Sequence, residues 1–148
     1  MLNPVPAQPM GKVTATITVT NQVDQILAER GFIPIDQVRT LTLNNVLVDT
    51  GATRLCLPAN LIAQLGLAPQ DEVEVKTAVG VKRVRLFKQV ILQVEGREGV
   101  YNCLELPNEA EPLLGLIPLE DLGLEPDLQN QRLRHLPTEG KDTYLTVL

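Results

Sequence analysis

The feature that most limits the fold of this chain is a β pattern that returns along most of its length. Residues 13–20 alternate apolar side chains with threonine at every step, which predicts a strand with one buried face. Strand patterns return over residues 38–48, where Asn44-Asn45 predicts a turn or a bulge. Residues 73–106 are typical of β structure throughout. We therefore expect a mostly β fold.

Turn residues divide this last β region into separate strands. Residues 73–77 alternate into the small residues Ala78-Val79-Gly80, which predicts a hairpin with these residues at its tip. Further along, Gly96-Arg97-Glu98-Gly99 predicts a turn between strands over residues 88–95 and 100–106. The region is therefore expected to fold as a chain of antiparallel strands.

Three short helices are predicted between the strands. The first covers residues 22–30, where apolar side chains have helical spacing and Gly31 follows. The other two begin at Pro58 and Pro118 and end at Gly66 and Gly123, which is the usual arrangement of proline at the start and glycine past the end.

A weak internal repeat accompanies the last two helices. The five residues from Leu65 to Pro69 resemble those from Leu122 to Pro126, and both sets end a helix that begins with proline. A glycine-bearing segment precedes each copy, Asp49-Thr50-Gly51 in the first and Leu113-Leu114-Gly115 in the second. The chain is thus predicted to have two similar halves, with one acid between them.

The 148 residues suit one domain, which we place at residues 12–148. Residues 1–11 carry three prolines and no periodicity, and we expect a flexible N-terminal arm. Residues 143–148 have the pattern of a last strand, which we expect at the interface of a dimer. The start of the chain does not resemble a signal peptide, no apolar run reaches membrane-spanning length, and the expected compartment is the cytoplasm.

Charge and cysteine content exclude several classes of function. A formal net charge of −5 does not favour nucleic-acid binding, which requires clustered Lys and Arg. Cys56 and Cys103 match no metal or redox spacing and are expected to be buried apolar residues. Serine or cysteine peptidase chemistry is not expected, because the single histidine, His135, lies near the end and is predicted to be exposed.

The sharpest feature of the sequence is Asp49-Thr50-Gly51, which follows the apolar Leu47-Val48. A carboxylate at the end of a buried strand is costly unless it is hydrogen-bonded. Gly51 lets the backbone turn and bring an N–H to the carboxylate, and Thr50 offers a hydroxyl to a neighbouring chain. The same tripeptide also forms ordinary turns, so the flanking segments decide its meaning.

With those flanking segments, the chain resembles the retropepsin-like aspartic proteases, and in particular the stand-alone bacterial members of that clan. Leu47 to Ala52 is similar to the catalytic signature of the family, and Leu113-Leu114-Gly115 is similar to its second hallmark. The hairpin around Ala78-Val79-Gly80 lies between them, where the family carries its flap. The resemblance covers residues 12–136.

The resemblance implies a role for each matching residue. Asp49 would be the catalytic acid, and Leu113, Leu114 and Gly115 would cross behind the active-site strand. The residues that support the active-site loop would be Thr50, Gly51, Ala52 and Thr53. The residues that close over the substrate as a flap would be Thr77, Ala78, Val79 and Gly80.

The implied fold is a single-domain, closed β-barrel or sandwich with a flap hairpin and one or two short helices, which acts as a homodimer. Two Asp49 carboxylates, one from each subunit, would activate a water molecule as an aspartic endopeptidase, without metal or cofactor. The substrate would be a peptide or protein segment in extended conformation. The alternative is a peptide-binding or dimerisation module of the same fold with little or no activity.

Overall fold

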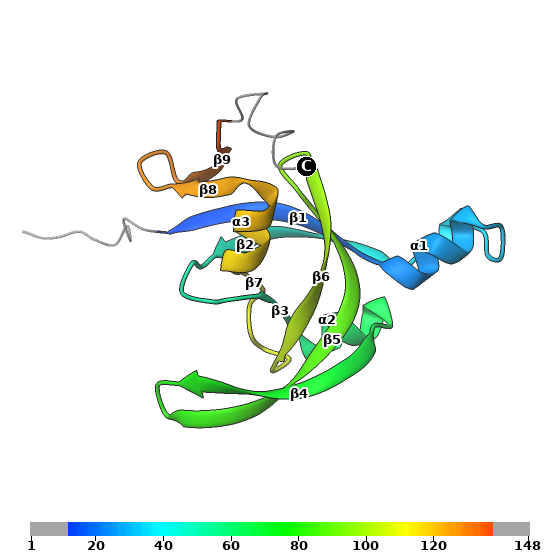
Figure 1. Ribbon diagram of the computed structural model, residues 1–148, viewed down its shortest axis with the longest axis horizontal. Coiled ribbons are helices and arrows are strands. Elements are labelled where there is room, and N and C mark those ends of the chain that lie inside the picture. The colour runs from blue at the N-terminus through cyan, green and yellow to red at the C-terminus, as the bar shows by residue number, and fades with distance from the viewer. Residues whose placement is uncertain (1–11, 138–148) are drawn as a thin grey trace, which may run out of the picture.

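The computed structural model describes residues 12–137, and the predicted arm at 1–11 and strand at 143–148 lie outside this range. Within it, seven strands form one sheet in the order β1-β2-β7-β3-β6-β5-β4 (Figure 1). β1 also pairs with β5, so six of these strands close on themselves and β4 is left outside the ring. The predicted mostly β, barrel-like class is confirmed.

The elements follow one another along the chain as follows: β1 Val13–Asn21, α1 Gln22–Glu29, the 3₁₀ turn η1 Ile35–Gln37, β2 Thr40–Val48, β3 Leu55–Pro58, α2 Ala59–Leu65, β4 Ala68–Thr77, β5 Gly80–Val94, β6 Arg97–Leu106, β7 Leu113–Leu114, α3 Leu116–Leu122, β8 Leu124–Asp127 and β9 Arg132–His135. β8 and β9 form a separate two-stranded sheet, which the sequence patterns did not predict. No helix within residues 12–137 is long and apolar enough to cross a membrane.

The alternation in β1 separates a core face from an outer face, as predicted. Val13, Ala15, Ile17 and Val19 are buried in the core. On the other face, threonine hydroxyls pair across to β2, for example Thr18 with Thr42 at 3.2 Å and Thr20 with Thr40 at 2.8 Å. The core is built almost wholly from Val, Leu and Ile side chains of the strands and of α2 and α3.

A bulge in β2 accounts for Asn44-Asn45. Ala15 pairs with Val46 whereas Ile17 pairs with Leu43, so one residue of β1 faces two residues of β2. Asn45 has a φ of 60°, and asparagine tolerates this left-handed conformation better than most residues. Of the two predicted alternatives, the bulge is confirmed.

The predicted turn at Gly96–Gly99 is wrong in its position. β5 runs without interruption to Val94, and only Glu95-Gly96 connect it to β6. Both connecting residues have positive φ, 52° and 77°, as a two-residue hairpin turn requires. Gly99 lies inside β6 instead, where the ring of Tyr101 covers it.

Helices end as predicted, and one begins earlier. α2 and α3 end at Gly66 and Gly123, which have left-handed φ values of 64° and 67°. α3 begins at Leu116 and not at Pro118, so Pro118 lies within its first turn. Proline is accepted there because the N–H groups of the first turn have no partners inside the helix. Helix α1 projects away from the sheet (Figure 1).

Candidate active site

Asp49 occupies the turn that leads out of β2, at the point where β2, β7 and β3 lie side by side. β7 runs parallel to β2, with Leu47 opposite Leu113 and Val48 opposite Leu114. It also pairs with β3 on its other side. The N–H of Asp49 donates to the carbonyl oxygen of Leu114 at 3.0 Å, which fixes the start of the loop to the neighbouring strand.

The carboxylate of Asp49 is held by its own loop. The N–H of Gly51 donates to Asp49 Oδ1 at 2.9 Å, and the N–H of Ala52 donates to the Asp49 carbonyl oxygen at 3.0 Å. A Cβ atom at Gly51 would lie 3.1 Å from the same Oδ1. Glycine therefore allows the backbone to approach the carboxylate, as the sequence predicted for this position.

Gly115 supports the other side of the loop, where backbone packs directly on backbone. A Cβ atom at Gly115 would lie 2.3 Å from the carbonyl oxygen of Arg54 and 2.8 Å from that of Ala52. The next two N–H groups, of Leu116 and Ile117, donate to the carbonyl oxygens of Ala52 at 2.8 Å and Thr53 at 2.9 Å. The two glycine-bearing segments of the sequence thus meet, and the first turn of α3 holds the Asp49 loop.

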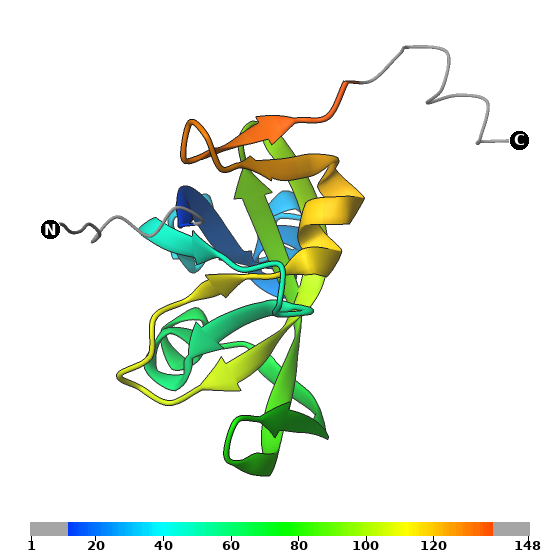
Figure 2. The same ribbon diagram turned by 90° about the vertical axis from the view of Figure 1, so that its left-hand side faces the viewer.

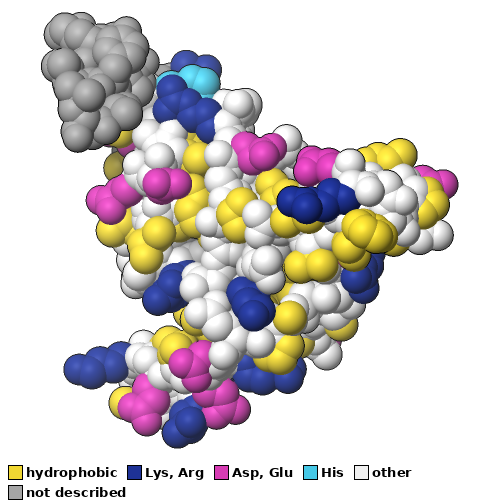
Figure 3. Space-filling model, turned by 45° about the vertical axis from the view of Figure 1, so that its right-hand side comes forward, with side chains coloured by type: hydrophobic (Ala, Val, Ile, Leu, Met, Phe, Trp, Pro, Cys, Tyr) yellow, Lys and Arg dark blue, Asp and Glu magenta, His cyan; other side chains and the backbone are white. Residues whose placement is uncertain are grey.

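A cleft of about 550 Å³ opens next to this loop. Its lining comes from the Asp49 loop, from the β4–β5 hairpin and from the strands beneath: Gly51, Ala52, Thr53, Arg54, Cys56, Val73, Glu74, Val75, Lys76, Val84, Leu104, Glu105, Leu106 and Leu113. The hairpin extends beyond the closed part of the sheet (Figure 1, Figure 2). Figure 3 shows a hollow between the projecting lobe at its lower left and the body of the molecule.

The predicted flap residues lie at the far end of this hairpin. Thr77 Oγ1 donates to the Gly80 carbonyl oxygen at 2.7 Å, and Val79 is 90% exposed. Among the described residues, Thr77 to Gly80 do not line the cleft, and the shaft of the hairpin from Val73 to Lys76 lines it instead. The sequence predicted the hairpin from the alternation at 73–77, but only Thr77 of these residues was assigned to the site, and Val73 to Lys76 were not.

Cys56, at the floor of the cleft, is not a reactive group. Burial and, to a smaller extent, the negative charge of Asp49 raise the pKa of the Cys56 thiol to about 11, against an opposing effect of Arg54. The thiol is therefore protonated at neutral pH and is a poor nucleophile. Within residues 12–137 no group of His, Cys, Asp and Glu side chains is placed to hold a metal ion. Asp49 is the ionisable group that the loop geometry presents.

His135 lies away from this loop, on β9. It is exposed, as predicted, and its Nε2 lies 2.7 Å from the carbonyl oxygen of Glu95 in the β5–β6 turn. Its contact with that turn gives no support to a Ser-His or Cys-His pair.

Comparison with protein families matches residues 42–121 to the gag-polyprotein putative aspartyl protease family. The chain belongs to this retropepsin-like aspartyl protease family. The match covers more than half of the chain, beginning inside β2 and ending inside α3. A search among curated proteins found no match.

The matched part of this aspartyl protease domain contains the whole constellation described above. Asp49, the β4–β5 hairpin and Gly115 all lie within residues 42–121. Membership supports a protease function in general. The feature of this chain that relates to such a function is the geometry of the loop around Asp49. β1, which closes the sheet against β5, and the β8–β9 hairpin lie outside the match, as does α1.

Proposed function

We propose that this aspartyl protease domain is an endopeptidase that works as a symmetric homodimer, with one Asp49 from each subunit. The observation that carries the proposal is the Asp49 loop. One half-buried carboxylate accepts from the Gly51 N–H, and backbone from the second half of the chain holds the loop that carries it. Acid–base cleavage of a peptide needs two carboxyl groups, and a two-fold axis near Asp49 would supply the second.

In the proposed reaction the two carboxyl groups share one proton, because two close carboxylates do not both ionise easily. The ionised group takes a proton from a water molecule, whose oxygen then attacks the scissile carbonyl carbon. The protonated group donates its proton to the carbonyl oxygen, which forms a tetrahedral intermediate. This intermediate collapses as the first group gives its newly acquired proton to the leaving amide nitrogen and a hydroxyl of the intermediate returns a proton to the second group. The pair returns to its starting state, so no metal or covalent intermediate is required.

The neighbouring residues have supporting roles in this proposal. The exposed Thr50 hydroxyl would bond across the two-fold axis to its counterpart, and Ala52, which lines the cleft, would pack beside the substrate. An extended peptide would lie along the cleft below the edge strand β4, like an added strand. The tip from Thr77 to Gly80 would close over it as a flap.

The first test compares the wild-type protein with Asp49→Asn on an unbiased peptide mixture, from about pH 4 to 7, where a carboxyl pair can hold one proton. Products are identified by mass spectrometry. We expect cleavage by the wild type and by Asp36→Asn, a control that removes an exposed carboxylate from η1, and none by Asp49→Asn. When the assay is extended to alkaline pH, a rate that still rises there would contradict the shared-proton mechanism.

Subunit mixing tests the one-acid-per-subunit proposal directly. Wild-type and Asp49→Asn chains are unfolded together, refolded at equal amounts and assayed on a peptide that the wild type cleaves. With random pairing into two-fold dimers, about one quarter of the dimers hold two Asp49 residues. The activity of the mixture should therefore fall to about a quarter of the activity of the same total amount of wild-type protein. A fall to one half would mean that each chain works alone. Dimers that bind peptides without cutting them would favour the binding-module alternative.

A further inference from the structure

Two positively charged residues line the cleft, the exposed Lys76 on the hairpin and the half-buried Arg54, and the proposed reaction uses neither of them. Arg54 lines the cleft, five positions after Asp49, and its side chain is half-buried. Its Nη1 donates to Asn102 Oδ1 at 2.9 Å, an anchor that reaches 48 residues along the chain to β6. A guanidinium group has five N–H donors, and this bond uses one of them. The remaining donors are held in a fixed place beside the active-site loop.

No carboxylate of the described residues neutralises this charge. The four ion pairs found within residues 12–137 all involve other arginines. Glu105, which also lines the cleft, has both carboxylate oxygens engaged by Arg85, at 2.9 and 2.7 Å. Glu74 and Lys76 are exposed on the hairpin and have opposite charges. The charge of Arg54 is therefore available to a bound molecule.

The rest of the cleft wall strengthens the effect of that charge. The side chains of Val73, Val75, Val84, Leu104 and Leu113 provide apolar surface around it. Charge–charge attraction is stronger beside apolar groups than in open water, and an arginine fork matches the two oxygens of a carboxylate. Its positive charge already acts on the cleft floor, where it opposes the rise in the Cys56 pKa.

We propose that Arg54 makes this protease selective for substrates with an aspartate or glutamate side chain next to apolar residues, close to the bond that is cut. This inference rests on the proposed function, because it concerns the same cleft. A symmetric dimer would present Arg54 twice, once on each side of the two-fold axis. The acidic preference is therefore expected both before and after the scissile bond, and Asn102 is the positioning residue that aims the guanidinium.

The test uses pairs of peptides that differ only by glutamate or glutamine at one position near the cleavage site. We expect wild-type kcat/KM to be about five- to tenfold higher for the glutamate peptide, since a partly exposed charge-assisted hydrogen bond has this size. Arg54→Gln should remove the difference, and Arg54→Glu should shift the preference to lysine at that position. Arg30→Gln, which removes an exposed arginine at the end of α1, should leave the ratio unchanged.

Two further measurements test the inference even if the Arg54 variants do not fold. Asn102→Ala should weaken the glutamate preference without altering cleavage of the glutamine peptide, which loss of folding would not do. Peptide binding to the Asp49→Asn protein, measured by fluorescence anisotropy, reports the preference without turnover. Selective binding without wild-type cleavage would overturn the proposed function and support the role of Arg54. Cleavage or binding that ignores glutamate in the wild type would overturn the role of Arg54 alone.

Discussion

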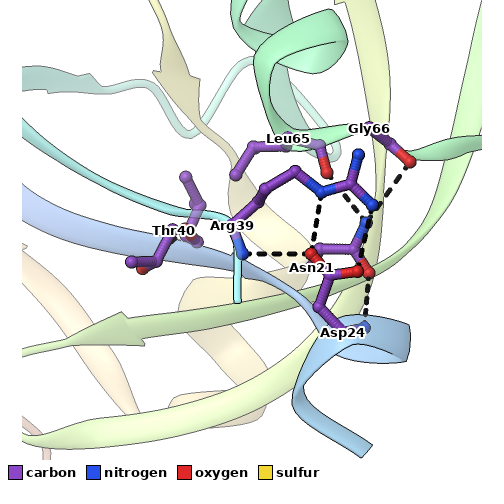
Figure 4. A network of polar contacts seen from close by, with 7 residues as sticks. Asn21, Asp24, Arg39, Thr40, Leu65 and Gly66 are labelled. Atoms are coloured by element: carbon purple, nitrogen blue, oxygen red, sulfur yellow. Dashed lines mark hydrogen bonds and ion pairs between the residues drawn. The ribbon is translucent and has the colours of Figure 1, made fainter. Parts of the chain in front are cut away.

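The two loops that end α2 and α3 are built alike, although they lie far apart in the sequence. In each, a left-handed glycine ends the helix, Gly66 in one and Gly123 in the other. A side chain from a distant strand then donates to the last two carbonyl oxygens. Asn21 Nδ2 reaches Leu65 at 2.8 Å and Gly66 at 3.3 Å (Figure 4). Arg97 Nη1 reaches the equivalent oxygens of Leu122 and Gly123 at 2.6 and 2.9 Å.

The two halves differ where β2 and β7 end. Val48 and Leu114 are paired neighbours, and the next residue is Asp49 in the first half and Gly115 in the second. The first position carries a carboxylate, whereas the second has no room for even a Cβ atom. One half therefore supplies a carboxylate and the other supplies close backbone support. A chain of this kind has one acid at its site, which is why a second copy enters the proposed mechanism.

The largest expected effect tests that lack of room. Gly115→Ala should lower the free energy of unfolding by about 3 kcal/mol or more, because its Cβ would meet the Arg54 and Ala52 backbone, which cannot move aside. The measurement is urea unfolding followed by circular dichroism. Gly31→Ala is the control, since nothing lies within 4 Å there and only its φ of 81° opposes a side chain, at a cost of about 1 kcal/mol. Equal losses would contradict the packing argument.

The next effect concerns the first of the two helix-ending loops. Asp24, buried at the start of α1, accepts from Arg39 Nε at 2.8 Å and Nη2 at 3.0 Å, and this pair packs over Gly66 (Figure 4). Asp24→Asn should lower the free energy of unfolding by about 2 kcal/mol at pH 7, a value discounted because Arg39 is half-exposed. Asp36→Asn, in the exposed η1 turn, should cost almost nothing.

The same pair predicts a pH dependence with a defined sign. The hydrogen bond from Arg39 lowers the pKa of Asp24 below its ordinary value of 3.8. The stabilisation is therefore complete above that value and is lost as the pH falls through the lowered pKa of the folded state. The difference between the wild type and Asp24→Asn should shrink when unfolding is repeated below about pH 4. A difference that stays constant down to pH 2 would contradict this assignment.

A smaller effect is expected at the second helix-ending loop. Arg97→Met keeps the apolar stem but removes both hydrogen bonds to the end of α3, and should cost about 1 kcal/mol because the half-buried carbonyls can bond water. Amide hydrogen exchange should become faster mainly in α3 and β8. Arg132→Met, on the exposed face of β9, is the matched control. A loss as large as that of Asp24→Asn would mean that the two loops are equally sensitive to loss of their side-chain contacts.

The smallest expected effect concerns the labelling of the two cysteines, which should hardly react in the folded protein. Burial raises the pKa of Cys56 to about 11 and that of Cys103 to about 12, so both thiols are protonated and shielded at pH 8. A thiol-reactive dye should label the native protein very slowly and label both cysteines after unfolding in urea. Fast labelling of Cys56 in the native state would mean that the cleft floor of the first half is open to reagents.

Local features of the fold were predictable because they depend on nearby residues. The alternation of β1, the bulge at Asn44-Asn45 and the helix ends at Gly66 and Gly123 all follow from backbone preferences or from side-chain spacing. The four-residue turn at Gly96 was wrong, because glycine is compatible with both a turn and a strand covered by an aromatic ring. The ring of Tyr101 over Gly99 decided between them.

The candidate site was predictable only in part, for the same reason. Asp49, Gly51 and Gly115 belong to recognisable motifs, and the structure brings them together. Arg54 and its anchor Asn102 carry no motif, because their importance comes from a contact between β6 and the start of β3. The same is true of Val84 and Leu104, which line the cleft from two further strands.

By itself, the sequence determined the strand character of β1, of β2 and of residues 73–106, which face of β1 is buried, where α2 and α3 end and which loop carries the acid. These properties depend on side-chain periodicity and on the conformational freedom of single residues. Only the tertiary structure decided that β7 lies between β2 and β3, that β1 closes the sheet against β5 and that Gly115 rests on the Asp49 loop. Such pairings join residues far apart in the chain, and they are selected by the packing of the whole core.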